Sequence, residues 1–341
     1  MYLATIDCGT TNSRVYIHDK HGHIIGKATK KVGVRDTAIT GQKEALKIGL
    51  KETFFEAVSL AGVNLDEVKL ILSSGMITSE IGLIEIPHLW APAGLEDLAR
   101  NMVKVQERSV FPVDIPIYFV RGIKNRYDPA SVSMEEVGWL DFMRGEETQV
   151  AGLLSDPTFT LPATVVFLSS HTKFVPINQN REILGSLTTP SGQVFEALTK
   201  ETSIGKSIKS DDNFQEQDFM DFKIIEIAQK WVDNSGFLRS LMMCRFMDTL
   251  LSTKWYQRKL FLDAVIAAED LRVLAQFEKL QFPLDTDFIL CGPNRRCRIY
   301  EYGLRHRLAA GKTVRIVDEN SGLDGLSIKG SIDLANLANL F

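Results

Sequence analysis

The chain has 341 residues, of which 45% are hydrophobic, and a formal net charge of −4 at pH 7. This length is typical of about two domains and buries enough surface to fold without disulfide bonds. The acidic balance argues against a general nucleic-acid-binding protein, because such proteins usually carry a basic face.

The N-terminus contains two β-prone runs, residues 3–7 and 15–17, that flank a polar turn and predict a hairpin. A glycine-bearing turn with several N–H and hydroxyl groups suits phosphate oxygens, and a carboxylate at its edge can hold Mg²⁺ through water. The carboxylate here is Asp7, and a hydrophilic turn without a ligand is the alternative interpretation. The Asp-x-Gly-Thr-Thr pattern resembles the first phosphate loop of the sugar kinase, actin and heat-shock chaperone superfamily. The turn residues are Gly9, Thr10, Thr11, Asn12, Ser13 and Arg14.

The next elements complete a first domain. Meander, helix and strand follow in the order of one half of an actin-like protein, and the strand ends in the turn Ser74-Gly75-Met76. A later strand ends at Arg121. The ranges predicted from periodicity are strands over 23–28, 68–74 and 113–120, and helices over 43–61 and 95–105.

Two adjacent carboxylates, Glu146 and Glu147, stand where a helix is predicted to begin. The helix dipole favours their ionised form, and an ionised carboxylate in a cleft can take the proton from a sugar hydroxyl. The alternative is that both only cap the first turn of the helix. The stretch precedes the second polar turn at the expected crossover between domains, and this location favours the catalytic interpretation.

A second strand–turn–strand unit follows, with a strand over 164–168 and the turn Ser169–Lys173. It repeats the strand–turn–strand order of the N-terminus and indicates a duplicated fold. We therefore predict an α/β fold of two actin-like (ribonuclease H-like) domains, residues 1–142 and 143–341, with mixed five-stranded sheets flanked by helices and a cleft between them. The remaining elements are strands over 181–187, 287–291 and 313–317, and helices over 190–205, 214–246, 249–277, 294–308 and 322–341.

Five motifs occur in the order seen in the 2-dehydro-3-deoxygalactonokinase family, and the chain resembles that family from Tyr2 to about Leu308. The most specific motif is Arg144-Gly145-Glu146-Glu147-Thr148-Gln149. The five stretches are 7–14, 74–77, 143–149, 171–174 and 191–195.

The resemblance implies a kinase that uses ATP and Mg²⁺ to phosphorylate 2-keto-3-deoxy-galactonate at its 6-position. Glu147 stands two residues before Gln149, as the catalytic Asp does in related carbohydrate kinases, so Glu147 is favoured as the base over Glu146. Asp7 is the implied metal ligand. The implied phosphate-binding residues are Gly9, Thr10, Thr11, Asn12, Arg14, Ser169, Ser170, His171, Thr172 and Lys173. The implied adenosine turn is Gly292, Pro293 and Asn294, and the implied substrate-binding residues are Ser74, Gly75, Met76, Arg144 and Arg121.

Two departures from the family pattern concern ligand binding. Ser169-Ser170 replaces Pro-Gly at the second phosphate turn, so either nearby hydroxyls compensate or ATP binds weakly. Residues 78–80 replace Gly-Ser-Arg, which removes an expected cation beside the sugar site. For the substrate carboxylate we therefore favour Arg144 first and Arg121 second, with a structural salt bridge as the alternative for Arg144.

The remaining expectations concern cellular context. No disulfide or zinc pattern joins Cys8, Cys244, Cys291 and Cys297, so free thiols in a reducing compartment are expected. The chain shows no signal peptide and no apolar run of roughly 20 residues, which predicts a cytoplasmic protein without membrane or nucleic-acid partners. The oligomeric state stays open, a homodimer included. A kinase of another carbohydrate and an actin-like ATP-binding regulator remain alternative functions.

Overall fold

The computed structural model describes residues 2–19, 21–210, 219–306 and 312–340. The chain divides into two compact units, whereas the sequence interpretation divides it after residue 142. Residues 143–160 belong with the N-terminal part. Unit 1 comprises Met1–Thr160, Gln179–Gly185 and Asp324–Phe341, and unit 2 comprises Leu161–Asn178 and Ser186–Leu323.

The main sheet of unit 1 has the strand order β3-β2-β1-β4-β8-β7. Strands β1, β2 and β3 form an antiparallel meander, while β4 and β8 continue the sheet in parallel with β1. The strands are β1 (Tyr2–Cys8), β2 (Ser13–His18), β3 (Ile24–Lys30), β4 (Val68–Gly75), β7 (Val103–Val105) and β8 (Ile117–Phe119).

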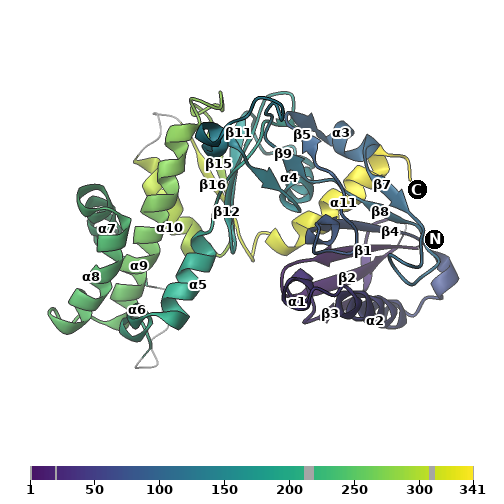
Figure 1. Cartoon of the computed structure of the whole chain (residues 1–341), viewed down its shortest axis with the longest axis horizontal. Helices are drawn as coiled ribbons and strands as arrows, with labels where there is room; N and C mark the ends of the chain where they lie inside the picture. The colour runs from purple at the N-terminus through teal and green to yellow at the C-terminus, as the bar shows by residue number, and fades with distance from the viewer. Residues whose placement is uncertain (1, 20, 211–218, 307–311, 341) are drawn as a thin grey trace. The chain divides into compact units, whose positions relative to one another are not determined.

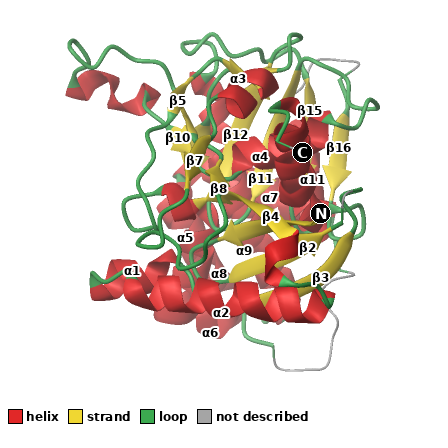
Figure 2. Cartoon of the chain, turned by 90° about the vertical axis from the view of Figure 1, so that its right-hand side faces the viewer, coloured by secondary structure: helices red, strands yellow, loops and turns green. Residues whose placement is uncertain are grey.

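Helix α2 (Glu44–Ala61) covers one face of this sheet, and α1 (Val34–Thr40) lies beside it in Figure 2. Leu46, Leu50 and Phe54 recur at helical spacing along α2 and are fully buried. Each buried side chain of this size contributes about 1.5–3 kcal/mol to the free energy of unfolding. This shared core fixes the ends of β1 and β4, from which the site residues extend.

The C-terminal helix α11 (Leu326–Leu337) packs against α4 (Glu146–Leu154) within unit 1, as Figure 1 shows. Glycines make this packing close. A Cβ atom on Gly330 would collide with the carbonyl oxygen of Thr148, and one on Gly152 with that of Leu326. The packing explains why the C-terminal residues belong to unit 1.

Unit 1 also contains short strands and a short helix outside its main sheet. Strand β9 (Ile123–Lys124) pairs with both β5 (Leu89–Trp90) and β10 (Phe142–Met143). Strand β6 (Ala93–Gly94) pairs with β13 (Glu182–Ile183), and helix α3 (Leu95–Arg100) follows β6.

The sheet of unit 2 has the order β14-β12-β11-β15-β16, with antiparallel pairing among the first three strands and parallel pairing beyond them. This order repeats β3-β2-β1-β4-β8 of unit 1, so the predicted fold of two actin-like domains is confirmed. Unit 1 adds β7 as a sixth strand. The strands are β11 (Ala163–Leu168), β12 (Thr172–Ile177), β14 (Leu187–Thr189), β15 (Asp287–Cys291) and β16 (Val314–Val317).

The helices of unit 2 include a bundle of α7, α8 and α9, which Figure 1 shows side by side. Helix α9 is buried on most sides, which suits the apolar stretch from Leu260 to Ala268 that only Asp263 interrupts. The helices are α5 (Ser191–Glu201), α6 (Ser203–Ser207), α7 (Phe222–Ser235), α8 (Phe237–Thr249), α9 (Trp255–Asp270) and α10 (Asn294–Arg305).

Several predicted elements were wrong in extent. The helix over 95–105 ends at Arg100, and its last residues form β7. The helix over 214–246 is interrupted at Gly236, where φ is +77°, and residues 211–218 lie outside the described residues. The strand over 181–187 is divided near Gly185, whose φ of +150° breaks the ladder.

Other differences are shorter elements. The strand over 113–120 is only β8, and the helix over 249–277 begins at Trp255 and ends in a 3₁₀ turn. The 3₁₀ segments are Leu65–Glu67, Met76–Thr78, Met134–Trp139, Leu271–Gln276 and Leu323–Gly325.

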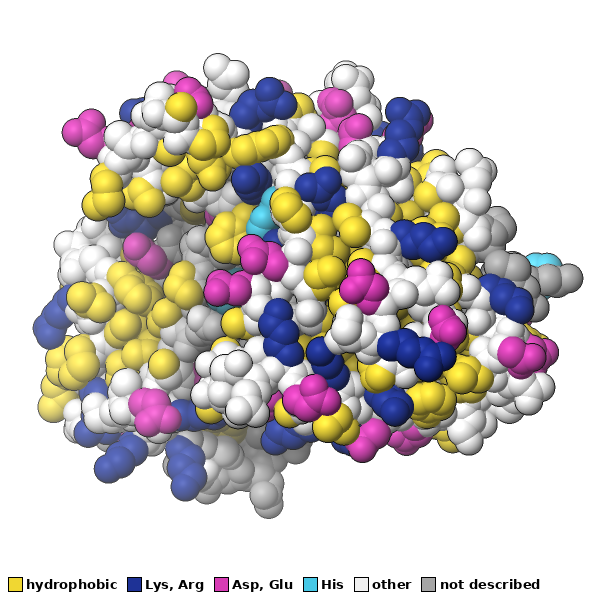
Figure 3. All heavy atoms as spheres, turned by 45° about the vertical axis from the view of Figure 1, so that its right-hand side comes forward, with side chains coloured by type: hydrophobic (Ala, Val, Ile, Leu, Met, Phe, Trp, Pro, Cys, Tyr) yellow, Lys and Arg dark blue, Asp and Glu magenta, His cyan; other side chains and the backbone are white. Residues whose placement is uncertain are grey.

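The surface and the cysteines agree with the composition. All four cysteines are buried free thiols, as predicted. Within the described part of the chain, no helix has both the length and the apolar character needed to cross a membrane. On the face drawn in Figure 3, Lys and Arg side chains are interspersed with Asp and Glu.

We expect Gly330→Ala to lower the free energy of unfolding by about 1–3 kcal/mol, because the added methyl must push α11 away from α4. Thermal unfolding of both proteins measures the change. Gly325→Ala, at the start of the same helix, is the control because open space surrounds its Cβ position. Equal unfolding midpoints for the two variants would contradict the close packing of α11 on α4.

Candidate functional site

The predicted residues at the start of the chain meet where two parallel strands of unit 1 end. Strands β1 and β4 pair so that Asp7 lies beside Ser74 and Cys8 beside Gly75. Because parallel strands end at the same edge of a sheet, the loop after Asp7 and the turn after Ser74 leave together. Cys8 is 1% exposed and faces the core, so it points away from the turn.

The loop after β1 is held by the first turn of α1. The Gly9 N–H donates to the Asn12 carbonyl oxygen at 3.0 Å, which closes the turn. The N–H groups of Val34 and Arg35 donate to the carbonyl oxygens of Gly9 and Thr10 at 3.2 and 2.9 Å. The side chains from Thr10 to Asn12 remain exposed on this fixed backbone. The loop therefore presents hydroxyl and amide groups to solvent.

Asp7 and Arg14 form an ion pair across the same hairpin, with 3.1 Å between Arg14 Nη1 and Asp7 Oδ2. Their side chains are 39% and 44% exposed, so each can also contact a ligand. Arg14 was predicted to bind phosphate, and the structure shows it engaged with the predicted metal ligand.

Two glycines bring the carboxylate pair to this edge of unit 1. Gly75 and Gly145 have φ of +86° and +112°, conformations that side chains rarely adopt. An ideal Cβ on Gly145 would lie 3.4 Å from the Gly75 Cα, so the two turns touch. Glu146 and Glu147 follow directly as the first residues of α4. The sequence-predicted residues Asp7, Ser74, Gly75, Glu146 and Glu147 thus belong to one cluster, which we call the acceptor cluster.

The two carboxylates differ in environment. Glu147 is fully buried, and both of its carboxylate oxygens lie 2.9 Å from the Gly145 nitrogen. Burial, together with the neighbouring Glu146 charge, raises the pKa of Glu147 to about 8, while the Gly145 N–H and Arg144 oppose the rise. Glu146 is only half-buried. Of the two, Glu146 is therefore the more exposed carboxylate, although its Oε2 atom is buried.

Both predicted arginines bind the same backbone segment. Arg144 donates to Thr78 Oγ1 at 2.8 Å and to the Ile86 carbonyl oxygen at 2.7 Å. Arg121 donates through Nε to the Pro87 carbonyl oxygen at 2.7 Å. These bonds fix both side chains beside the acceptor cluster. Arg121 uses only Nε in its bond to Pro87, which leaves the two ends of its guanidinium for a carboxylate.

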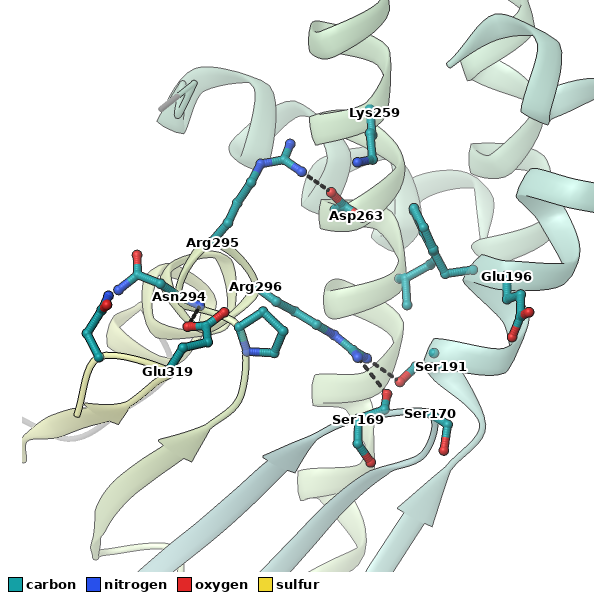
Figure 4. A pocket seen from close by; sticks show the side chains of 15 residues that line it. Ser169, Ser170, Ser191, Glu196, Lys259, Asp263, Asn294, Arg295, Arg296 and Glu319 are labelled. Atoms are coloured by element: carbon teal, nitrogen blue, oxygen red, sulfur yellow. Dashed lines mark hydrogen bonds and ion pairs between the residues drawn. The ribbon is translucent and has the colours of Figure 1, made fainter. Parts of the chain in front are cut away.

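Unit 2 contains a cavity of about 800 Å³ that residues far apart in the sequence line together. Its wall comes from the turn between β11 and β12, the first turn of α5, the middle of α9 and the first turn of α10, as Figure 4 shows. The cavity includes predicted residues Ser169, Ser170, Pro293 and Asn294. Residues that sequence reasoning missed are Ser191, Gly192, Lys259, Asp263, Arg295, Arg296, Glu319 and Asn320.

The second turn is braced by hydrogen bonds rather than by a glycine of its own. Thr172 is buried, and its hydroxyl lies 2.5 Å from that of Ser191. A Cβ on Gly192 would collide with the Ser169 carbonyl oxygen, so the first turn of α5 approaches Ser169 closely. The Ser169 hydroxyl donates to the His171 carbonyl oxygen at 3.0 Å. Gly192 therefore permits the close contact between the first turn of α5 and the turn at Ser169-Ser170.

Two residues predicted to neutralise phosphate are differently placed. Lys173 is 9% exposed and donates to the Thr188 hydroxyl at 2.9 Å, so it belongs to the sheet. Burial lowers the pKa of His171, and the Lys173 charge lowers it further, so His171 is neutral at physiological pH.

The predicted adenosine turn packs against the strands. A Cβ on Gly292 would lie 2.7 Å from Leu168 Cβ, so this glycine permits contact between β11 and the turn. Asn294 donates through Nδ2 to Asp318 Oδ2 at 2.6 Å, and its N–H donates to Glu319 Oε2 at 3.3 Å. Pro293 and Asn294 line the cavity.

The positions of Arg295 and Arg296 in the sequence could have identified them as candidate site residues, but the sequence interpretation did not use them. Both follow the Gly292 turn in the first turn of a predicted helix, where the helix dipole disfavours positive charge. Cations at such a position indicate nearby anions. Asp263 is one of them, 2.8 Å from Arg295.

Two known proteins are similar to this chain. A candidate 2-dehydro-3-deoxygalactonokinase, DgoK1 of Rhizobium meliloti (strain 1021), is 24% identical over 220 residues. That match covers 62% of this chain and 61% of the relative, so it spans less than two thirds of the relative's length. The crystal structure of a candidate 2-dehydro-3-deoxygalactonokinase from Sinorhizobium meliloti superimposes with a TM-score of 0.73 and 20% identity, covering 98% of each chain.

The sequence profile of one family matches almost the whole chain. It covers residues 7–327, which include the acceptor cluster in unit 1 and the cavity in unit 2. A match over more than half of a chain establishes membership. The chain belongs to the 2-keto-3-deoxy-galactonokinase family.

Proposed function

We propose that this protein is an ATP-dependent kinase that phosphorylates 2-dehydro-3-deoxy-galactonate at its 6-hydroxyl. The observation that carries the proposal is the acceptor cluster of unit 1 in a member of this family: Glu146 follows Arg144 by two residues, and Arg144 and Arg121 are both fixed on the segment Ile86–Pro87. A sugar acid requires both kinds of group: a cation for its carboxylate and a base for its reacting hydroxyl.

Glu146 is the proposed base, in place of the Glu147 that the motif spacing favours. The acceptor hydroxyl attacks the γ-phosphorus of ATP, its proton passes to the Glu146 carboxylate, and ADP leaves. Glu147 is fully buried, and both of its oxygens face the Gly145 N–H. Its role is to fix the turn at Gly145 from which Glu146 projects.

The substrate carboxylate is assigned to Arg121 in preference to Arg144. Both terminal nitrogens of Arg144 already donate, to Thr78 and to Ile86, so fewer of its N–H groups remain for a ligand than in Arg121. Arg121 is anchored through Nε alone, and a carboxylate can then accept from both Nη groups. Ser74, Gly75 and Met76 provide the adjoining wall.

The cavity of unit 2 is the proposed nucleotide site. Its volume of about 800 Å³ is within the range of small-molecule sites, and hydroxyls and cations line it. Ser169 and Ser170 would contact phosphate oxygens, and Pro293 and Asn294 would contact the adenosine. In unit 1, the exposed side chains from Thr10 to Asn12 also suit phosphate oxygens, which is a separate proposal.

Asp7 suits the magnesium ion that accompanies ATP. Mg²⁺ in such sites keeps several waters and is bound by one or two carboxylates plus phosphate oxygens, so a single half-exposed carboxylate matches its needs. Asp7 would hold the ion through water, with Arg14 orienting the carboxylate. When bound, Mg²⁺ neutralises charge on the transferring phosphoryl group.

A different sugar acid is the second candidate substrate. It is favoured by Glu80, an exposed carboxylate two residues after the Thr78 that Arg144 binds, where the family resemblance leads us to expect a cation.

The direct test is ADP formation from ATP and Mg²⁺ with a panel of 2-keto-3-deoxy acids and aldonic acids, followed by localisation of the phosphate by NMR. We expect turnover with 2-dehydro-3-deoxy-galactonate and a 6-phosphate product. Turnover with none of the acids would refute the kinase proposal, and turnover with another acid would replace the substrate.

We expect Glu146→Gln to lower kcat by about 10²-fold or more with little change in nucleotide affinity, because the amide cannot accept the hydroxyl proton. Steady-state kinetics and calorimetry measure the two quantities. Glu44→Gln, in the exposed first turn of α2, is the control. A folded Glu147→Gln protein that loses turnover while Glu146→Gln retains it would return the role of base to Glu147.

We expect Arg121→Ala to raise KM for the sugar acid by about 10–100-fold and to leave KM for ATP unchanged, since it removes a charged hydrogen-bond partner of the carboxylate. Arg126→Ala is a matched control, because Arg126 also donates to a backbone carbonyl, that of Ala91. An unchanged KM in Arg121→Ala would exclude Arg121 from the substrate site.

Glu147 also makes stability depend on pH. Its pKa is about 8 in the folded protein and near 4.5 when unfolded, so the folded state holds the extra proton between these values. Stability therefore falls as pH rises through this window, by up to about 1.4 kcal/mol per pH unit. We expect Glu147→Gln to remove this decline, as measured by urea unfolding at pH 5 and pH 8. Equal declines in wild type and variant would show that Glu147 is ionised throughout.

A further inference from the structure

We propose that Arg296 is the residue that neutralises nucleotide phosphate charge in unit 2, an assignment that rests on the nucleotide site proposed above. Arg296 stands in the first turn of α10, and its side chain crosses the cavity toward Ser169 and Ser191, as Figure 4 shows. This orientation places a permanent positive charge at the second phosphate turn.

Three hydrogen bonds hold the guanidinium in place. Nη1 donates to the Ser169 carbonyl oxygen at 2.7 Å. Nη2 donates to Thr172 Oγ1 at 3.0 Å and to Ser191 Oγ at 2.8 Å. These acceptors belong to the turn, to β12 and to α5, so one side chain joins all three elements. An anchored guanidinium loses little additional entropy when it binds an anion.

The hydrogen-bonding capacity of Arg296 is only partly used. A guanidinium has five N–H groups, and three of them donate to the acceptors named above. All three acceptors are uncharged, and no carboxylate among the described residues forms an ion pair with Arg296. Its neighbour Arg295 differs, since Asp263 lies 2.8 Å from it. The cavity therefore contains a fixed cation whose charge is uncompensated and whose remaining N–H groups suit an anion.

The other cations predicted for this role are less suited to it. Lys173 is 9% exposed and bonded to Thr188, and His171 is neutral because burial and Lys173 lower its pKa. The carboxylates of the cavity are also engaged: Glu319 accepts from the Asn294 N–H at 3.3 Å, and Glu196 pairs with Lys200. Arg296 is thus the cation that can pair with the phosphates of a nucleotide bound in the cavity.

The test separates charge from scaffolding by comparing ADP with adenosine, which lacks phosphate. Calorimetry measures both affinities for wild type, Arg296→Gln and Arg296→Lys. Gln keeps hydrogen-bond donors without charge, and Lys keeps the charge without the forked geometry. Arg298→Gln, an exposed position on the same helix, is the control. Thermal unfolding followed by circular dichroism establishes that each variant is folded.

We expect Arg296→Gln to weaken ADP binding by about 10–100-fold while adenosine binding stays within about twofold, and we expect Arg296→Lys to retain most of the ADP affinity. Added salt should weaken ADP binding more in wild type than in Arg296→Gln. Equal loss of ADP and adenosine affinity, or a Gln variant that binds ADP better than the Lys variant, would show a scaffolding role and overturn the proposal. Wild type that binds neither ligand would refute the nucleotide site itself.

Discussion

The parallel register between β1 and β4 is the constraint on which the acceptor cluster depends. It places Asp7 beside Ser74, so two chain segments separated by a long helix leave the sheet at one edge. The turn at Gly75 then touches the turn at Gly145, because neither residue has a side chain. A slip of one residue would turn Asp7 into the core and Cys8 toward the ligand. The core that packs α2 on this sheet therefore also fixes which side chains lie at the edge of the sheet.

Unit 2 uses the same strand order but builds its site differently. In unit 1, loop backbone and glycine contacts set the arrangement. In unit 2, polar side chains from several elements converge on a cavity, and hydrogen bonds among Thr172, Ser191 and Arg296 hold the wall. The family pattern at the second turn has a glycine of its own. Here Ser169 and Ser170 form the turn, and Gly192 allows the first turn of α5 to contact it closely.

The two adjacent glutamates are chemically identical, and burial is what gives them different environments. Both start the same helix, and both would be ionised by the helix dipole alone. Packing places Glu147 out of contact with water, and its pKa rises to about 8. The side chain of Glu146 stays partly exposed. Motif spacing favours Glu147 as the base and exposure favours Glu146, because spacing along a chain does not report which side of a helix faces the core.

The sequence alone determined the two-domain α/β fold, the family and the strand-end turns, since alternating apolar patterns and glycine-bearing turns are local signals. It located Asp7, the glutamate pair and the turn at Ser169 without any structure. Tertiary structure decided what these residues contact. It assigns residues 143–160 and the C-terminal helix to unit 1. It also brings Ser191 and Arg296 to the second turn. Such contacts join residues far apart in sequence, and only packing sets which of them stay accessible to a ligand.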